Sequence, residues 1–166
     1  MDERTEIVQR VRALLAAQRY AALCTQRDGT PYGSLVAFAA TDDLRCLVFA
    51  TMRASRKFGN LIADPRVAVL VDNRSNQETD LREAMATTAT GRATVAAGAE
   101  RARLEEMLLV RHPYLTSFVS SPGCAVVRVD VDVYHTVTRF QNVYEIHMGT
   151  DAGGAYAGAQ LDHPAL

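Results

Sequence analysis

Residues 20–51 read YAALCTQRDGTPYGSLVAFAATDDLRCLVFAT. Three runs rich in apolar residues, 20–26, 31–40 and 45–51, are separated by two short polar segments. The first separator contains Asp28-Gly29, a pair typical of a tight hairpin turn, and the second contains Thr41-Asp42-Asp43. Connections this short cannot hold a crossover helix, so the stretch predicts an antiparallel meander rather than parallel strand–helix–strand units.

The flanking sequence extends this pattern on both sides. Residues 3–18 place apolar side chains at helical spacing and predict an amphipathic helix. Downstream, the patterns predict helices at 55–64 and 100–110, strands at 66–72, within 81–97, at 124–137 and at 140–147, a polar loop at 73–80 and a connector at 112–122. The unbroken apolar run Val67–Val71 predicts a strand buried on both faces. In the strand at 124–137 we expect one face to carry Val127, Val129, Val131 and Val133.

These elements predict a mainly β protein with short helices. Six or seven short antiparallel strands in a small chain favour a closed or partly closed barrel. We expect a single domain over residues 1–148, followed by a loose tail, rich in glycine and alanine, over residues 149–166.

Composition excludes several classes of partner. The 166 residues carry a net charge of −1, so a broad nucleic-acid surface is not expected. The three cysteines contain no paired motif, which is typical of a reducing cytoplasm. The first residues do not read as a signal peptide, and the longest apolar run, 35–40, is too short to span a membrane. The four histidines show no metal-binding spacing, so we expect a cytoplasmic protein with no metal site and no membrane partner.

The stretch with chemical content is TMRASRKFGN, residues 51–60. Ser55 is a preferred helix N-cap, and the N-terminus of a helix attracts anions. Arg56 and Lys57 fall in the first turn, where the helix dipole disfavours cations unless an anion binds. The expected helix would place Arg56, Lys57 and Asn60 on one side and Phe58 with Ile62 on the core side. Spacing alone leaves two interpretations open, a phosphate site and a solvated basic turn.

Several motifs together resemble the pyridoxamine 5′-phosphate oxidase-like FMN-binding split-barrel family. They are the hairpin Asp28-Gly29-Thr30-Pro31, Ser34-Leu35-Val36, Ala50-Thr51, Ser55-Arg56-Lys57, Asn60-Leu61 and Asp64-Pro65-Arg66-Val67. The resemblance covers residues 18–97 well and continues weakly through 124–146. It implies a split β-barrel that binds FMN.

The resemblance also implies roles for particular positions. Ser34, Leu35 and Val36 would lie along the flavin, and Ala50 and Thr51 would close on the ribityl chain and phosphate. Ser55, Arg56 and Lys57 would hold the phosphate. The cofactor would lie at the interface of a homodimer, where the second subunit offers residues such as Asn73 in the loop 73–77 and Arg139 and Gln141 in the segment 138–142.

The sequence departs from the oxidase pattern at two places. Ala86 stands where that pattern has a glutamine, and the Arg-x-His segment that binds pyridoxamine is missing after His147. We therefore expect an FMN-dependent oxidoreductase that uses a nicotinamide or another small-molecule electron donor, rather than a true pyridoxamine 5′-phosphate oxidase. Two alternatives remain open: a deazaflavin-dependent reductase, and a non-catalytic flavin- or haem-binding protein. His147 is the reason that the haem alternative stays open, because one branch of the superfamily degrades haem with a terminal histidine.

Overall fold

The structure is a computed structural model that describes residues 2–139, 142–149 and 156–158. Its strands are β1 (Tyr20–Arg27), β2 (Thr30–Ala40), β3 (Cys46–Met52), β4 (Arg66–Asp72), β5 (Met85–Val95), β6 (Cys124–Thr138), β7 (Asn142–His147) and β8 (Tyr156–Gly158). Its helices are α1 (Glu3–Ala17), α2 (Arg56–Ala63), α3 (Asp80–Glu83), α4 (Gly98–Arg111) and α5 (Thr116–Val119), with a 3-10 turn, η1, at Pro113–Leu115.

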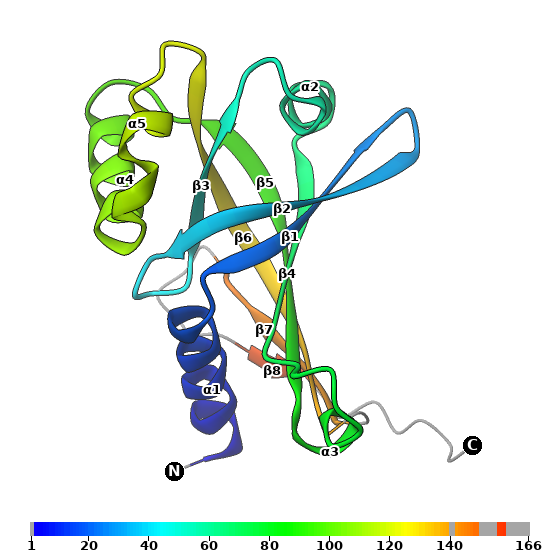
Figure 1. Ribbon diagram of the computed structural model, residues 1–166. Coiled ribbons are helices and arrows are strands. Elements are labelled where there is room, and N and C mark those ends of the chain that lie inside the picture. The colour runs from blue at the N-terminus through cyan, green and yellow to red at the C-terminus, as the bar shows by residue number, and fades with distance from the viewer. Residues whose placement is uncertain (1, 140–141, 150–155, 159–166) are drawn as a thin grey trace.

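The strands form one antiparallel sheet that closes on itself. Their order is β3-β2-β1-β4-β5-β6-β7-β8, and a further pairing joins β3 to β6. Strands β1 to β6 therefore make a six-stranded barrel, and β7 and β8 extend the sheet beyond it (Figure 1). This confirms the predicted split barrel. The predicted hairpin is confirmed as well, with Asp28 at φ 51° and Gly29 at φ 78°, as a two-residue primed turn requires.

The segment predicted to be a loose tail lies mostly outside the described residues. Within it, Tyr156–Gly158 forms a strand that pairs with Glu145–His147 of β7. A loose tail is therefore the wrong description for these three residues. The physical reason is the free edge of β7, whose backbone groups accept another strand.

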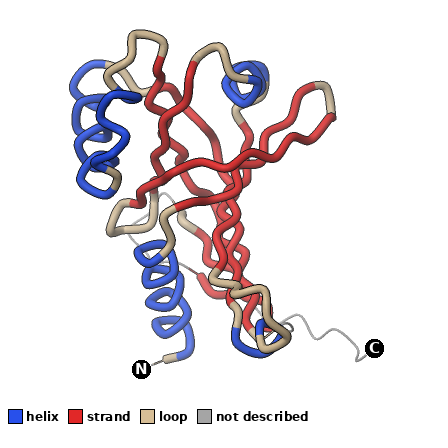
Figure 2. The backbone as a smooth tube through the Cα atoms, in the orientation of Figure 1, coloured by secondary structure: helices blue, strands red, loops and turns tan. Residues whose placement is uncertain are grey.

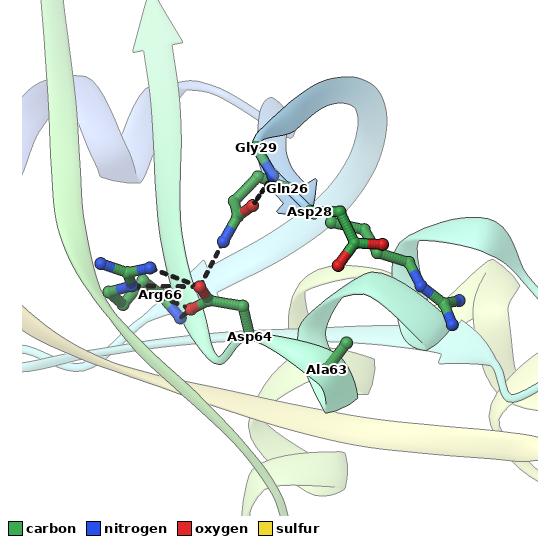
Figure 3. Close-up of a pocket in the computed structure, with 7 residues that line it drawn as sticks. Gln26, Asp28, Gly29, Ala63, Asp64 and Arg66 are labelled. Carbon is green, nitrogen blue, oxygen red and sulfur yellow. Dashed lines mark hydrogen bonds and ion pairs between the residues drawn. The ribbon is translucent and has the colours of Figure 1, made fainter.

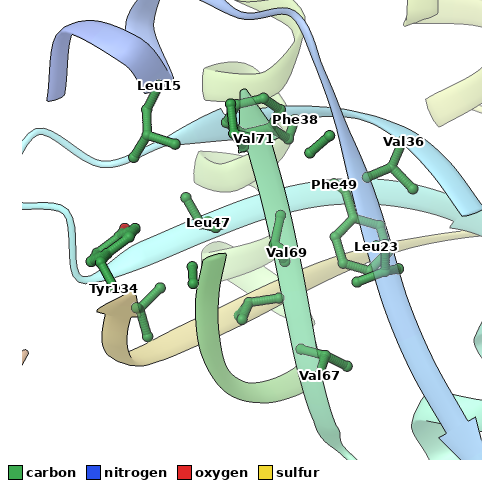
Figure 4. Close-up of a cluster of buried hydrophobic side chains, with 14 of the residues drawn as sticks. Leu15, Leu23, Val36, Phe38, Leu47, Phe49, Val67, Val69, Val71 and Tyr134 are labelled. Carbon is green, nitrogen blue, oxygen red and sulfur yellow. The ribbon is translucent and has the colours of Figure 1, made fainter. Parts of the chain in front are cut away.

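The barrel interior is the main apolar core (Figure 4). Alternate residues of the barrel strands enter it, and α1 adds the side chains of Ile7, Val11, Leu14 and Leu15, as its amphipathic pattern predicts. Tyr134 is fully buried there and donates a hydrogen bond to the carbonyl of Leu44 at 2.6 Å. Burial raises the pKa of Tyr134, so the phenol stays protonated.

The helices lie around the strands (Figure 2). A second, smaller core lies outside the barrel, where α4 and α5 pack on β3 and β6 through Val48, Leu104, Leu108, Val119 and Val126. This packing holds α5 and η1 beside β2 and β3, where they become one wall of the candidate site.

The predicted alternation along β6 is wrong at Val133. Val127, Val129 and Val131 are buried as expected, but Val133 is only half-buried, and Tyr134 takes the inward position. The pairing register with β5 shifts between Thr90 and Gly91, so a β-bulge moves the alternation by one residue.

The prediction that Val67–Val71 is buried on both faces is also wrong. Val67, Val69 and Val71 are buried, whereas Ala68 and Leu70 are half-buried on the outer face of the barrel. Among the described residues, no helix covers that outer face completely, so Ala68 and Leu70 keep part of their surface exposed.

Candidate functional site

The turn between β3 and α2 is held by short polar contacts. The Oγ of Ser55 accepts a hydrogen bond from the backbone N–H of Phe58 at 3.2 Å, which confirms Ser55 as the N-cap. The hydroxyls of Thr51 and Ser55 lie 2.9 Å apart, and the N–H of Arg53 donates to the carbonyl of Gly123 at 2.8 Å. The start of α2 is thereby fixed at the rim of the barrel, with the backbone N–H groups of its first residues free of helical partners.

The face that α2 buries differs from the prediction. Asn60 is buried and donates a hydrogen bond from Nδ2 to the hydroxyl of Thr25 at 3.0 Å, and Leu61 is buried beside it. Ile62, expected on the core side, is 60% exposed. A polar side chain takes the inner position because β1 supplies a partner for its amide.

A groove of about 370 Å³ opens beside this turn. Its floor comes from β2 and β3, one end comes from the start of α2, and η1 and α5 supply a wall. Six of the predicted cofactor residues line it: Leu35, Val36, Ala50, Thr51, Ser55 and Lys57. The structure thus brings together residues from two strands and a helix start that the sequence analysis had grouped only by resemblance.

Arg56 lies in a different place from Lys57. The Arg56 guanidinium lies 5.4 Å from the centre of the Tyr32 ring, and both residues line a neighbouring pocket of about 270 Å³ together with Arg27. Consecutive residues of a helix point about 100° apart. The two cations predicted to hold the phosphate therefore face different sites: Lys57 faces the groove and Arg56 faces the neighbouring pocket.

Four further predicted residues lie outside the groove lining or outside the described residues. The Ser34 hydroxyl is buried with no hydrogen-bond partner. Asn73 accepts a hydrogen bond from the N–H of Met85 at 2.7 Å and so joins the ends of β4 and β5. Arg139 is exposed, with φ at 50°, in a separate pocket next to α1. Gln141 falls outside the described residues.

The sequence analysis missed an aromatic wall of the groove. Tyr20, Tyr114 and Phe118 line it and are 49%, 55% and 37% exposed. The hydroxyls of Tyr20 and Tyr114 lie 3.0 Å apart, and the hydroxyl of Tyr114 lies 3.0 Å from Nδ1 of the buried His112. No local pattern marks these residues, because 94 positions separate the two tyrosines.

A larger open pocket of about 640 Å³ lies at the tip of the first hairpin (Figure 3). One of its two carboxylates, that of Asp64, accepts hydrogen bonds from the backbone and side chain of Arg66 and from Gln26. The bond from the Arg66 side chain, above all, lowers the pKa of Asp64. The hydrogen bonds of Asp64 with Arg66 and Gln26 explain the Asp64-Pro65-Arg66 motif as a structural joint between α2 and β4.

The thiols, His135 and His147 do not line the groove. Cys46 and Cys124 are buried, and burial raises the pKa of Cys46 to about 11, whereas Cys24 is exposed. His147 is exposed on β7, with Nε2 3.0 Å from the Glu145 carboxylate. Among the described residues, no three His, Cys, Asp or Glu side chains form a group that could hold a metal ion.

The sequence matches the family described as pyridoxamine 5′-phosphate oxidase over residues 7–137. The chain belongs to this family. The match covers the whole barrel from β1 to β5 and nearly all of β6. No curated protein matches the sequence.

Solved structures share the fold at low sequence identity. A haem-binding protein from Mycobacterium smegmatis has a TM-score of 0.73 and 18% identity, covering 82% of this chain and 55% of its own. Campylobacter jejuni ChuZ has a TM-score of 0.79 and 11% identity, with 100% and 68% covered. A FAD-binding protein from Mesorhizobium loti has a TM-score of 0.60 and 19% identity, with 75% and 88% covered.

The chain spans about half the length of the haem-binding protein it resembles. These proteins include both a flavin-binding and a haem-binding protein, so the fold itself does not select between the two ligands. In the part of the chain that the structure describes, no helix is long and apolar enough to cross a membrane.

Proposed function

We propose that this protein is an FMN-binding oxidoreductase that exchanges electrons with a nicotinamide or another small molecule. The observation that carries the proposal is the groove in which Lys57 and the N-terminus of α2 lie at one end of an apolar floor. FMN, when bound, supplies a ring that accepts and donates electrons, while the protein binds and orients it.

The residues of the groove fit the parts of FMN. The helix N-terminus, the Ser55 cap and the Lys57 ammonium suit a phosphate dianion. Ala37 and Ala50 have small side chains, and Leu35 is apolar and 72% exposed, so a flat ring has room to stack on this floor.

The proposal includes a second copy of the chain, which would cover the open side of the groove. Ala22 of β1 lies opposite both Leu35 of β2 and Leu70 of β4, so these three side chains form an apolar row across the outer face. Leu35 belongs to this row and also to the groove lining. A partner that covers the row therefore also covers the groove, which supports a homodimer with the cofactor at the interface.

Two features separate this function from its alternatives. Among the described residues no histidine lines the groove, which supports a flavin over haem with a histidine ligand. Ala86 has a methyl group where the oxidase pattern has an amide, which supports a substrate other than pyridoxamine 5′-phosphate.

The first test is reconstitution of the purified protein with FMN. A bound oxidised flavin shows two visible absorption bands, whereas haem shows one intense Soret band and a deazaflavin a single band. An oxidoreductase should then bleach on addition of NADH or NADPH with air excluded. A protein that takes up no FMN contradicts the proposal, and one whose FMN is bleached by dithionite but by neither nicotinamide nor any other biological donor is a binding module.

The second test asks which cation holds the phosphate. Loss of one charge-assisted hydrogen bond, about 1.5–3 kcal/mol, predicts that Lys57→Ala weakens FMN by roughly one to two decades. Riboflavin, which lacks the phosphate, should bind the variant nearly as before. Arg56→Ala is the matched control, because Arg56 lines the neighbouring pocket. Equal weakening of FMN and riboflavin by Lys57→Ala would place the phosphate elsewhere.

A further inference from the structure

A line of hydrogen-bonding groups runs from the groove into the core. Nε2 of His112 lies 2.8 Å from the carbonyl oxygen of Phe38, and Nδ1 lies 3.0 Å from the hydroxyl of Tyr114. The hydroxyl of Tyr114 lies 3.0 Å from that of Tyr20. His112 has no exposed surface, whereas both tyrosines are about half exposed and line the groove.

The chemistry of each group fixes the direction of these bonds. A carbonyl oxygen only accepts, so Nε2 of His112 carries the hydrogen and donates to Phe38. In the neutral ring, Nδ1 is then an acceptor, and the Tyr114 hydroxyl donates to it. The Tyr114 oxygen in turn accepts from the Tyr20 hydroxyl. The Tyr114 hydrogen is thus directed at His112 and the Tyr20 hydrogen at Tyr114, and each oxygen keeps a lone pair that is available to a hydrogen-bond donor.

These acceptors lie at the end of the groove away from the cation. Tyr20 of β1 pairs with Ala37 of β2, whereas β3 runs on through Met52 to the turn that carries Ser55. Lys57 and the helix N-terminus therefore mark one end of the groove and the two phenols mark the other. A ligand that fills the groove meets a positive end and a hydrogen-bond-accepting end.

A purely structural role accounts for only part of this arrangement. The bond from His112 to Phe38 is buried and ties the end of α4 to β2. The bond between the two tyrosines is exposed, and exposed neutral hydrogen bonds add little to stability because water competes for both partners. What the tyrosine pair adds is a pair of oriented acceptors on the wall of a groove.

We propose that Tyr20 and Tyr114 form a recognition site for an N–H group on the ring of the bound ligand, with His112 as the residue that sets their orientation. The inference rests on the proposed function, because the isoalloxazine ring of FMN carries an imide N–H on its pyrimidine end, and the proposal turns this end, rather than the dimethylbenzene end, toward the tyrosines. A bound ligand covers the two tyrosine oxygens, and a ligand that lacks the donor is then disfavoured because it leaves those oxygens covered and unpaired.

The test compares FMN with 3-methyl-FMN, in which a methyl group replaces the imide hydrogen. Fluorescence titrations would measure both dissociation constants for the wild-type protein, Tyr20→Phe and Tyr114→Phe. We expect the wild type to prefer FMN by roughly five- to tenfold, and both variants to reduce this preference to less than about twofold. Tyr32→Phe is the matched control, since Tyr32 lines the neighbouring pocket, and it should keep the full preference.

The orientation of His112 has its own measurement. ¹⁵N resonances of the imidazole should show the Nε2–H tautomer, and addition of FMN, but not of 3-methyl-FMN, should shift the Nδ1 resonance through Tyr114. A preference that persists unchanged in both tyrosine variants, or a His112 ring with hydrogen on Nδ1 alone, overturns the inference. Absence of FMN binding by the wild type would instead overturn the proposed function.

Discussion

Gly91 is the position where one added methyl group should do the most damage to the barrel. A Cβ atom built there lies 2.0 Å from the backbone oxygen of Asp130 and 3.0 Å from the Cα of Val131. Both contacts are with backbone on β6, so no side chain can turn aside to relieve them. The β5–β6 register shift begins at this residue, and the close approach of the two strands depends on glycine.

The magnitude follows from this geometry. Ordinary contacts begin at 3.4 Å, so the strands have to part by about 1.4 Å to admit Gly91→Ala. Overpacking a rigid site lowers the free energy of unfolding by about 1–3 kcal/mol and occasionally more. Alanine offsets about 0.4–1 kcal/mol of this loss, because it restricts the unfolded chain more than glycine does. We expect a net loss of about 1–2.5 kcal/mol in the free energy of unfolding and a fall in Tm of roughly 2–10 °C.

Urea denaturation followed by circular dichroism would measure this loss. Gly33→Ala is the matched control, because it makes the same replacement in a strand where nothing lies within 4 Å of the added carbon. The control should change the free energy of unfolding by no more than about 0.5 kcal/mol. If Gly91→Ala proved as harmless as the control, the bulge would not depend on the missing side chain and the reasoning would be refuted.

Asn60→Ala should lower the free energy of unfolding by about 1–3 kcal/mol, because it leaves the buried Thr25 hydroxyl unpaired. Ile62→Ala, on the exposed side of the same helix, is the control and should change that free energy by less than about 0.5 kcal/mol in the same urea assay. The thiol of Cys24 should react first with an aromatic disulfide reagent in the native protein, and rapid labelling of all thiols would contradict the burial of Cys46. Burial raises the pKa of the Cys46 thiol from 9.0 to about 11 in the folded protein. The protonated thiol therefore stabilises the fold below pH 9, and this stabilisation is lost as the pH rises toward 11. In Cys46→Ala, the free energy of unfolding should fall less steeply between pH 9 and pH 11.

The elements that could be predicted from the sequence are those made by neighbouring residues. The first hairpin depends on Asp28-Gly29, whose positive φ angles are a local property of that pair. The Ser55 cap and the turn that starts α2 likewise involve residues within a few positions of one another. Such features are determined before any distant strand is placed, so their signals survive in the sequence alone.

The errors arose where a distant partner decides the outcome. Val133 changes face because the bulge pairs β6 with Gly91, some forty residues earlier. Asn60 turns inward because a threonine of β1 accepts its amide hydrogen, and no helical periodicity contains that information. In both cases a long-range contact changed the direction of side chains in a correctly predicted element.

The candidate groove combines both kinds of information. Its cationic end, at Ser55 and Lys57, is built from consecutive residues, and this is the part that the sequence motif already indicated. Its other end exists only because α4 and η1 return the chain to β1, which places Tyr114 against Tyr20. A local motif of this kind can bind a group that many ligands share, such as a phosphate. The aromatic wall, which depends on distant segments of the chain, can differ between barrels that share the motif. We therefore expect ligand selection within this groove to depend more on the tyrosine pair than on the phosphate end. If so, variants at Tyr20 and Tyr114 should change which ligand the groove prefers.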